Sequence, residues 1–299
     1  MARSTWRQTL AGIQETGVLC ALLILGLAFS LTTDTFLEPA NLLQVARQAS
    51  YFGIMAAGMV LVLTLGEVDL SVGSVLTLVN VLTAVLLREG WPLGAALLLG
   101  LGAGASCGFL NGALSVLLRI PMIIVTLGTM SVYRGLALVI SKATPISQFS
   151  KEGAFFELGG GTVLGVPASV AVMLVAGACG HVLLNHTAFG RRVQAIGSNP
   201  QAARFSGIPI TRHRLWVMTL MGAASAVAGI MALAFLQSAD PSTGPGMELY
   251  VIASAVIGGT ALTGGSGSIL GGILGALIIA VIRNGLVLLG LPASWSTAV

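Results

Sequence analysis

The chain has 299 residues, of which 56% are hydrophobic and only 8% are charged, and its mean hydropathy is +0.97. A soluble domain carries about 25% charged residues, so the composition excludes a water-soluble globule. The formal charge of +4 at pH 7 comes without a basic patch interleaved with aromatic residues, which argues against nucleic-acid binding. The apolar runs are long and continuous, whereas an outer-membrane barrel alternates in strands of about ten residues. We therefore expect an all-α, polytopic membrane protein.

Nine apolar windows are assigned to crossings of the hydrocarbon core, which is roughly 30 Å thick. They are residues 17–32, 42–65, 70–87, 92–118, 122–141, 163–185, 215–236, 249–264 and 268–289. A tenth apolar segment begins near Leu291 and stops at Val299, too short to cross. The first window is interpreted as a retained span, because no small-residue cleavage site follows it. The prediction is a single transmembrane domain over residues 1–299, with nine full spans plus a truncated tenth.

The distribution of basic residues sets the predicted orientation. With a cytoplasmic N-terminus, the inside loops hold more basic residues than the outside loops, as the positive-inside rule requires. The inside set is Arg3, Arg7, Arg119, Arg191, Arg192, Arg204, Arg212 and Arg214, and the outside set is Arg88, Lys142 and Lys151. We expect a multi-pass protein of the bacterial inner membrane, with a long outside loop at 142–162 and a long cytoplasmic loop at 186–214. Three glycines at 159–161 predict a flexible stretch in the outside loop.

Two carboxylates, Glu67 and Asp69, lie between the second and third spans. On a helix, residues two apart lie on nearly opposite faces, so the pair would not share a proton. One interpretation is that Asp69 or Ser71 caps the third span and satisfies its unpaired amides. The other is a role in gating, because ionisable groups at membrane depth are functional candidates by default. The two interpretations are compatible.

Two stripes of glycine line helix faces in the fourth and ninth spans. They consist of Gly100, Gly104, Gly108 and Gly112, and of Gly267, Gly271 and Gly275. This spacing lets a neighbouring helix come close, either in static packing or in a sliding contact. Gly-Gly pairs at 258–259, 264–265 and 271–272 indicate interrupted helices, which are tolerated only where protein or water satisfies the freed backbone. That favours a pathway over a passive anchor.

The fifth span carries a polar face. Thr126, Thr129 and Tyr133 follow one another at i, i+3 and i+7, and Asn111 in the fourth span is a similar polar candidate. A stripe of hydroxyl groups suits a wet passage for a neutral, hydroxylated solute. Such groups also hydrogen-bond between packed helices or back to their own carbonyls. Lining and packing are therefore both open for these residues.

The cytoplasmic loop predicts a short helix at about 200–206. Asn199 suits the N-cap, Pro200 suits the first helical position, and Gly207 suits the residue just past the end. The helix carries Gln201, Ala202, Ala203, Arg204 and Phe205. A helix this short is unstable alone in water, so it packs on its own bundle or docks on a partner. Its aromatic and arginine side chains favour docking.

The sequence lacks the residues that several kinds of chemistry require. No G-x-x-x-x-G-K-[ST] motif occurs, so the chain does not cradle ATP in that way and its energy source lies elsewhere. The three histidines have no metal-ligand spacing, and the three cysteines lie in apolar runs without a disulfide or zinc pattern. No set of nucleophile, base and orienting group occurs at membrane depth. We therefore expect neither an intramembrane enzyme nor a cofactor or metal bound by this chain.

Four segments together resemble the permease subunit of ribose-type ABC importers. They are GEVDLSVGSVL at 66–76, IPMIIVTLGTMSVYRGLALVIS at 120–141, FGRRVQAIGSNPQAARFSGIP at 189–209 and GMELYVIASAVIGGTALTGGSGSILGGILGA at 246–276. That family includes permeases for xylose, rhamnose and similar sugars and for the autoinducer-2 signal, with branched-chain amino acid permeases as more distant relatives. The resemblance implies a type II importer fold that continues through a complete final span beyond the position of Val299.

The resemblance also implies partners and an energy source. Two identical or paired permeases would assemble with two cytoplasmic ATPase subunits, which bind ATP and Mg²⁺, and with an extracytoplasmic solute-binding protein. The helix with Gln201, Ala202 and Ala203 would be the coupling helix that docks on the ATPase. The expected function is import of a monosaccharide or related solute. The alternatives are a proton-coupled secondary transporter that uses Glu67 and Asp69, a branched-chain amino acid ABC permease, and a membrane subunit without transport.

Overall fold

The computed structural model describes residues 3–151, 153–163 and 165–291 and is mostly helical. The elements in chain order are α1 (Arg3–Thr32), α2 (Pro39–Thr64), α3 (Val72–Arg88), α4 (Leu93–Leu118), α5 (Met122–Ser141), α6 (Ala154–Gly160), β1 (Thr162–Val163), β2 (Val166–Pro167), α7 (Ala168–His186), α8 (Ala188–Ser198), α9 (Pro200–Phe205), α10 (Ile210–Leu236), α11 (Met247–Ile257) and α12 (Ile269–Leu288). The strands pair antiparallel, with Val163 opposite Val166. The helical prediction is confirmed apart from this hairpin.

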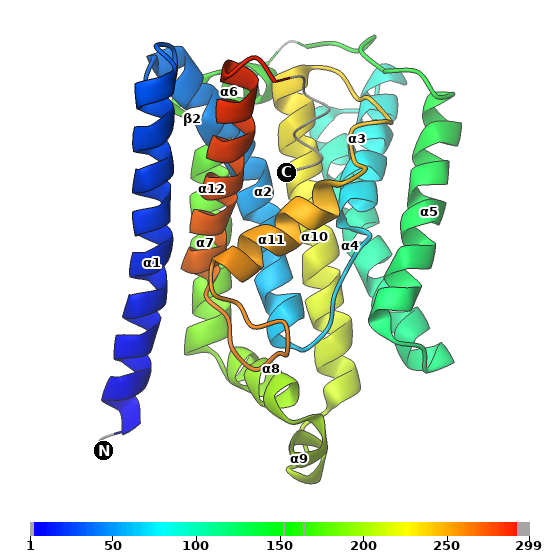
Figure 1. Ribbon diagram of the computed structural model, residues 1–299. Helices are drawn as coiled ribbons and strands as arrows, with labels where there is room; N and C mark the ends of the chain where they lie inside the picture. The colour runs from blue at the N-terminus through cyan, green and yellow to red at the C-terminus, as the bar shows by residue number, and fades with distance from the viewer. Residues whose placement is uncertain (1–2, 152, 164, 292–299) are drawn as a thin grey trace.

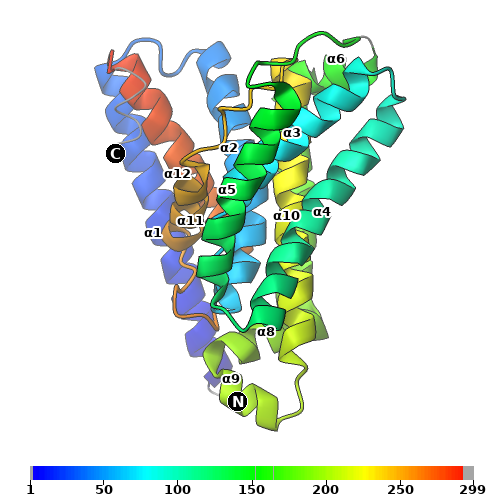
Figure 2. The same cartoon turned by 90° about the vertical axis from the view of Figure 1, so that its right-hand side faces the viewer.

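α2 is the central helix of the bundle and packs against α7, α10, α11 and α12. Every residue from Phe52 to Leu65 is buried, and nearly all of these residues are apolar or glycine. A helix that is hydrophobic all round belongs in the interior, which explains its central place. α1 packs on α12 at one edge of the bundle, and α5 packs on α3 and α4 at the other (Figures 1 and 2).

The two ends of the bundle are built differently. α8 and α9 project at one end, here named the α9 end, and α6 lies at the opposite end, named the α6 end (Figure 1). The predicted loop at 186–214 is therefore helical over most of its length. α8 begins where Thr187 Oγ1 accepts a hydrogen bond from Gly190 N at 3.2 Å, a side-chain N-cap.

Six of the described helices are long and apolar enough to cross a membrane, namely α2, α4, α5, α7, α10 and α12. α3 has 17 residues and α11 has only 11, so the predicted set of nine full crossings is not confirmed. The window at 249–264 is wrong as a continuous span. α11 ends at Ile257, Gly259 takes a φ of +88°, and residues 258–268 are not helical. The predicted tenth segment lies beyond Leu291 and therefore outside the described residues.

The Gly-Gly pairs give a mixed result. The pairs at 258–259 and 264–265 lie in the non-helical segment after α11, as predicted, whereas the pair at 271–272 lies inside α12. There the glycines serve close packing, because a Cβ at Gly271 would overlap the Gly258 carbonyl oxygen. The prediction of an interruption at 271–272 is therefore wrong.

The first glycine stripe marks a backbone contact between α4 and α10. A Cβ at Gly108 would overlap the Met218 carbonyl oxygen, and a Cβ at Gly104 would lie 2.7 Å from Gly222 O. Lipid provides no hydrophobic drive for helix association, so such close approach is a main source of stability in a membrane bundle. The stripe is used for packing in this conformation.

The predicted flexible stretch at 159–161 is wrong for two of its three residues. Gly159 and Gly160 form the last turn of α6. A Cβ at Gly159 would overlap Ala234 of α10, so this glycine provides close contact between two helices instead of chain flexibility.

Candidate functional site

The segment between α2 and α3, residues 65–71, is not helical and holds both candidate carboxylates. Asp69 is 2% exposed, and its Oδ1 accepts hydrogen bonds from Ser71 N at 2.8 Å and from Ser71 Oγ at 2.7 Å. The carboxylate thereby turns the chain into α3, which begins at Val72. The predicted cap is therefore wrong: Ser71 occupies the N-cap position of α3 but makes no side-chain capping bond, and Asp69 satisfies donors just ahead of the helix and not those of its first turn.

A buried network connects this turn to α4 and α5. Asn111 donates from Nδ2 to Ser71 Oγ at 2.8 Å, and its Oδ1 accepts from the Tyr133 hydroxyl at 3.0 Å. The same hydroxyl lies 3.0 Å from the Cys107 carbonyl oxygen. All of these side chains are buried, so protein groups supply the hydrogen bonds that water would otherwise provide. The name buried network is used below for Asp69, Ser71, Asn111 and Tyr133.

The threonines of the polar face of α5 lie beside the buried network. Thr126 is fully buried, and its Oγ1 accepts a hydrogen bond from Leu70 N at 3.2 Å. Thr129 is half-buried and donates to Thr126 O at 3.4 Å within its own helix. The prediction that Thr126, Thr129 and Tyr133 share a face holds, and in this conformation that face packs toward α3 and α4.

Glu67 points away from the buried network and forms an ion pair with Arg214 of α10. The Glu67 side chain is 16% exposed and that of Arg214 is 31% exposed, so the pair is partly shielded from solvent. Glu67 and Asp69 serve different helices. Glu67 ties residues 65–71 to the start of α10, while Asp69 ties them to α3 and, through Ser71, to α4.

The short helix at the α9 end forms as predicted. Asn199 Oδ1 accepts a hydrogen bond from Ala202 N at 3.0 Å, Pro200 is the first helical residue, and Gly207 has a φ of +75°. Ala203 is 4% exposed and belongs to the hydrophobic core, whereas Phe205 is 91% exposed. The outward face of α9 is formed by Gln201, Ala202, Arg204 and Phe205. Ala203 thus anchors the helix and does not lie on its outer face.

α8 joins this short helix to the centre of the bundle. Gly197, near the end of α8, packs against the Thr64 carbonyl oxygen at the end of α2, and a Cβ there would lie 2.5 Å from Gly265 N. Gly265 N itself donates to Thr64 O at 2.8 Å. The ends of α2 and α8 and the segment 258–268 therefore meet at one point, and glycine is what permits this approach.

Sequence reasoning missed two separate contacts between arginines and aromatic rings. The Arg283 guanidinium lies 4.5 Å from the Tyr250 ring centre and 5.4 Å from that of Phe52. Arg47 lies 4.6 Å from the Phe235 ring centre. Arginines within apolar spans were the available signal, but the rings that face them come from helices distant in sequence. The interaction stabilises each guanidinium, because the ring face is electronegative.

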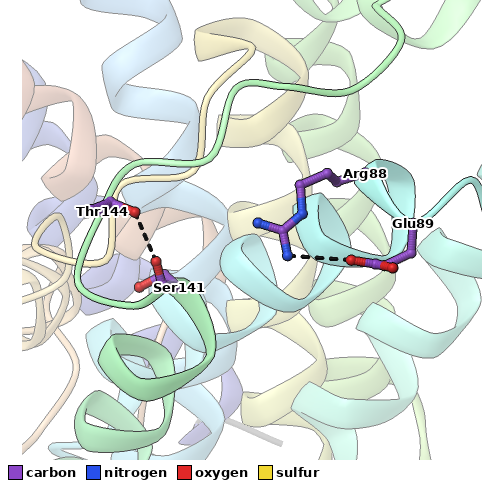
Figure 3. A network of polar contacts seen from close by, with 4 residues as sticks. All are labelled: Arg88, Glu89, Ser141 and Thr144. Carbon is purple, nitrogen blue, oxygen red and sulfur yellow. Dashed lines mark hydrogen bonds and ion pairs between the residues drawn. The ribbon is translucent and has the colours of Figure 1, made fainter.

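At the α6 end, the ends of α3 and α5 present short polar contacts (Figure 3). Arg88 and Glu89 form an exposed ion pair at 3.4 Å, and the Thr144 hydroxyl donates to Ser141 O at 2.9 Å. Exposed pairs of this kind stabilise a fold by about 0–1 kcal/mol. Their structural effect is therefore local. In the part of the chain that the structure describes, no cluster of three or more His, Cys, Asp or Glu residues is arranged to hold a metal ion.

Comparisons with known proteins give a family match and several similar permeases. Residues 41–299 match the family described as branched-chain amino acid transport system / permease component. The chain is 40% identical to the ribose import permease protein RbsC of Bacillus subtilis (strain 168), over 96% of this chain and 89% of that protein. It is 36% identical to the L-arabinose ABC transporter permease protein AraH of Azospirillum brasilense, over 94% of this chain and 82% of that protein. It is also 36% identical to the D-allose transport system permease protein AlsC of Escherichia coli (strain K12), over 88% of this chain and 81% of that protein.

One solved structure has a similar backbone arrangement. It is described as an inward-facing conformation of a metal-chelate type ABC transporter, and it aligns with a TM-score of 0.54 over 96% of this chain and 95% of its own. The sequence identity is 14%, so this similarity concerns the fold alone.

Proposed function

We propose, from the premise that this chain belongs to the branched-chain amino acid transport system / permease component family, that it imports a monosaccharide or related small hydroxylated solute. The chain is an ABC permease subunit without an ATPase site of its own. The observation that carries the sugar assignment is the 36–40% identity to ribose and L-arabinose permeases over 94% or more of the chain. These relatives are named for sugars, so the comparisons favour neither a proton-coupled carrier nor an amino acid permease.

The proposed assembly contains two permeases, two ATPase subunits that bind ATP and Mg²⁺, and a solute-binding protein outside the cell. We place the α9 end in the cytoplasm, and with it the start of α1. The support is the positive-inside rule, because the basic side chains near α8, α9 and the start of α10 outnumber those near the α6 end. The α6 end, with the polar edge of Figure 3, would then receive the binding protein.

α9 is proposed as the coupling helix. Its outward face combines an exposed aromatic ring, Phe205, with a cation, Arg204, and such residues are typical interface anchors. Behind it, Gly197 contacts the ends of α2 and of the segment 258–268. A displacement of α9 by the ATPase would therefore reach α2 and the segment 258–268 through α8. The ATPase can shift the permease only by as much as its affinities for the two permease states differ.

Glu67 and Asp69 are proposed to act in gating through the helices that they join. The polar side chains of Asn111, Thr126, Thr129 and Tyr133 are proposed to hold together the helices on which they lie. The buried network binds α3, α4 and α5 together, so these three helices are expected to move as one unit.

The test of function is uptake by the complete transporter in sealed vesicles. The permease is reconstituted with its ATPase and binding protein, and entry of radiolabelled ribose, arabinose and leucine is measured. Sugar uptake is expected to require both ATP and the binding protein and to survive a protonophore at constant ATP. Uptake that collapses with the protonophore, or that favours leucine, would contradict the proposal.

The test of coupling compares two exposed aromatic residues at opposite ends. Phe205→Ala is expected to weaken ATPase binding by roughly tenfold or more, as for an aromatic anchor. Trp91→Ala at the α6 end, where Trp91 is 49% exposed, serves as the matched control and should leave binding unchanged. Equal ATPase co-purification by both variants would remove α9 from the interface.

A further inference from the structure

Two grooves at the α9 end share two residues, Arg212 and Trp216 of α10. The first groove lies toward α7 and α8 and is lined by Leu183, Phe189 and Leu220 together with Arg192. The second lies toward α4 and is lined by Ala105, Phe109 and Leu215. Their volumes are about 440 and 380 Å³, within the range of roughly 300–1,000 Å³ typical of ligand pockets. Arg212 and Trp216 therefore lie between two largely apolar grooves.

The charged side chains that line the two grooves all carry positive charge. Arg192 and Arg212 are both exposed, and neither forms an ion pair with a described carboxylate. No Asp or Glu occurs among the described residues that line either groove. The neighbouring His213 is buried, with its ring stacked on Phe189 and its Nδ1 2.8 Å from Pro209 O. The guanidinium groups of Arg192 and Arg212 therefore face outward and can bind an anion.

The depth of the grooves fits the boundary between headgroups and acyl chains. Arg212 is two residues from the start of α10, while Thr219, at the far side of the second groove, is seven residues further along. At 1.5 Å per residue, the groove descends by roughly 10 Å along the helix, away from the basic end. Trp216 and Phe109 are 52% and 48% exposed, and tryptophan is enriched where a membrane meets water.

We propose that an anionic phospholipid binds at this end of α10. Its phosphate is held by Arg192 and Arg212, and its two acyl chains lie in the two grooves on either side of Trp216. Basic pockets between helices on the cytoplasmic side are a recognised type of anionic-lipid site. This site is separate from α9 and from the buried network, and its occupancy does not depend on which solute is carried.

The test measures lipid binding by the full purified chain, with phosphatidylglycerol and phosphatidylcholine of equal chain length as probes and native mass spectrometry as readout. The unaltered protein is expected to bind phosphatidylglycerol the more tightly. Arg192→Gln and Arg212→Gln are each expected to weaken phosphatidylglycerol binding roughly fivefold, while Arg212→Lys retains it. Arg191→Gln is the matched control, because Arg191 is exposed on the same helix as Arg192 but lines neither groove.

Two outcomes would overturn the proposal on the unaltered chain, without reliance on any variant that fails to fold. Equal binding of the two lipids would remove the role of the arginines. Equal binding of dioctanoyl and dioleoyl phosphatidylglycerol would remove the role of the grooves. A loss with Arg191→Gln as large as with Arg212→Gln would also contradict a defined site. If Arg192→Gln and Arg212→Gln release the ATPase but leave lipid binding unchanged, these arginines belong to a protein interface and the lipid proposal fails.

Discussion

The contact between α4 and α10 allows a sharp test of how this bundle is held together. Replacing Gly108 by alanine adds one methyl group at a point where backbone meets backbone. The new Cβ would overlap the Met218 carbonyl oxygen and lie 2.9 Å from the Met218 carbonyl carbon and 3.0 Å from Gly222 N. Ordinary contacts begin at 3.4 Å, and the overlap with the carbonyl oxygen is the largest of the three, so α10 must move by roughly an ångström or more. Backbone atoms, unlike a flexible side chain, cannot rotate out of the way.

The expected magnitude follows from overpacking. Extra methyl groups in a well-packed core cost about 1–3 kcal/mol of stability. Alanine also improves helix propensity over glycine by about 1 kcal/mol, which offsets part of that loss. Gly102→Ala on the same helix isolates the packing effect, because nothing lies within 4 Å of the position its Cβ would take. The two variants share the propensity gain, so their free energies of unfolding should differ by about 1–3 kcal/mol.

The assay is denaturant unfolding of the purified full chain in mixed micelles, followed by near-ultraviolet circular dichroism. Gly108→Ala should unfold at lower denaturant concentration than Gly102→Ala, and Gly102→Ala should match or exceed the unaltered protein. If the two variants unfold together, the glycine stripe does not determine the spacing of α4 and α10, and the packing interpretation is wrong.

Three further changes test individual contacts. Asn199→Ala removes the acceptor of the Ala202 N–H and should cost α9 about 1 kcal/mol, seen as faster amide exchange over 200–205, with Asn199→Ser restoring protection. Glu67→Gln and Arg214→Gln should show a coupling energy of at least about 0.5 kcal/mol in a double-mutant cycle, and zero coupling would refute the ion pair. Asp69→Leu leaves the Ser71 donors without an acceptor and should cost about 1–3 kcal/mol in the free energy of unfolding, whereas Asp69→Asn keeps an oxygen and should cost less.

Local signals in the sequence predicted the local structures well. Asn199, Pro200 and Gly207 placed α9 to within one residue, because capping depends on a few adjacent backbone groups. The polar face of α5 was also predictable, since helical periodicity alone brings Thr126 and Tyr133 to one side. Continuous apolar runs placed most of the long helices to within about five residues at their ends, but α1 begins at Arg3, well before the predicted window at 17–32.

Long-range partners could not be predicted in the same way. The apolar run at 249–264 reads as a span, yet the chain leaves the helix at Gly258, where its close neighbour is Gly271 on α12. The acceptor of the Asn111 amide and the rings beside Arg283 likewise come from helices far along the chain. Hydropathy reports how well a residue tolerates lipid, and it carries no information on which helix will cover that residue.

The central place of α2 has a consequence for how the protein is made. In the finished bundle 78% of its most apolar stretch is buried, yet the helices that cover it, α7, α10, α11 and α12, are all synthesised later. At about 5–20 residues per second, α2 waits on the order of ten seconds or more in lipid before its last neighbour emerges from the ribosome. Its side chains must therefore be compatible with lipid first and pack against the other helices afterwards. A polar substitution in this helix is expected to fail already at membrane insertion, before any packing can compensate.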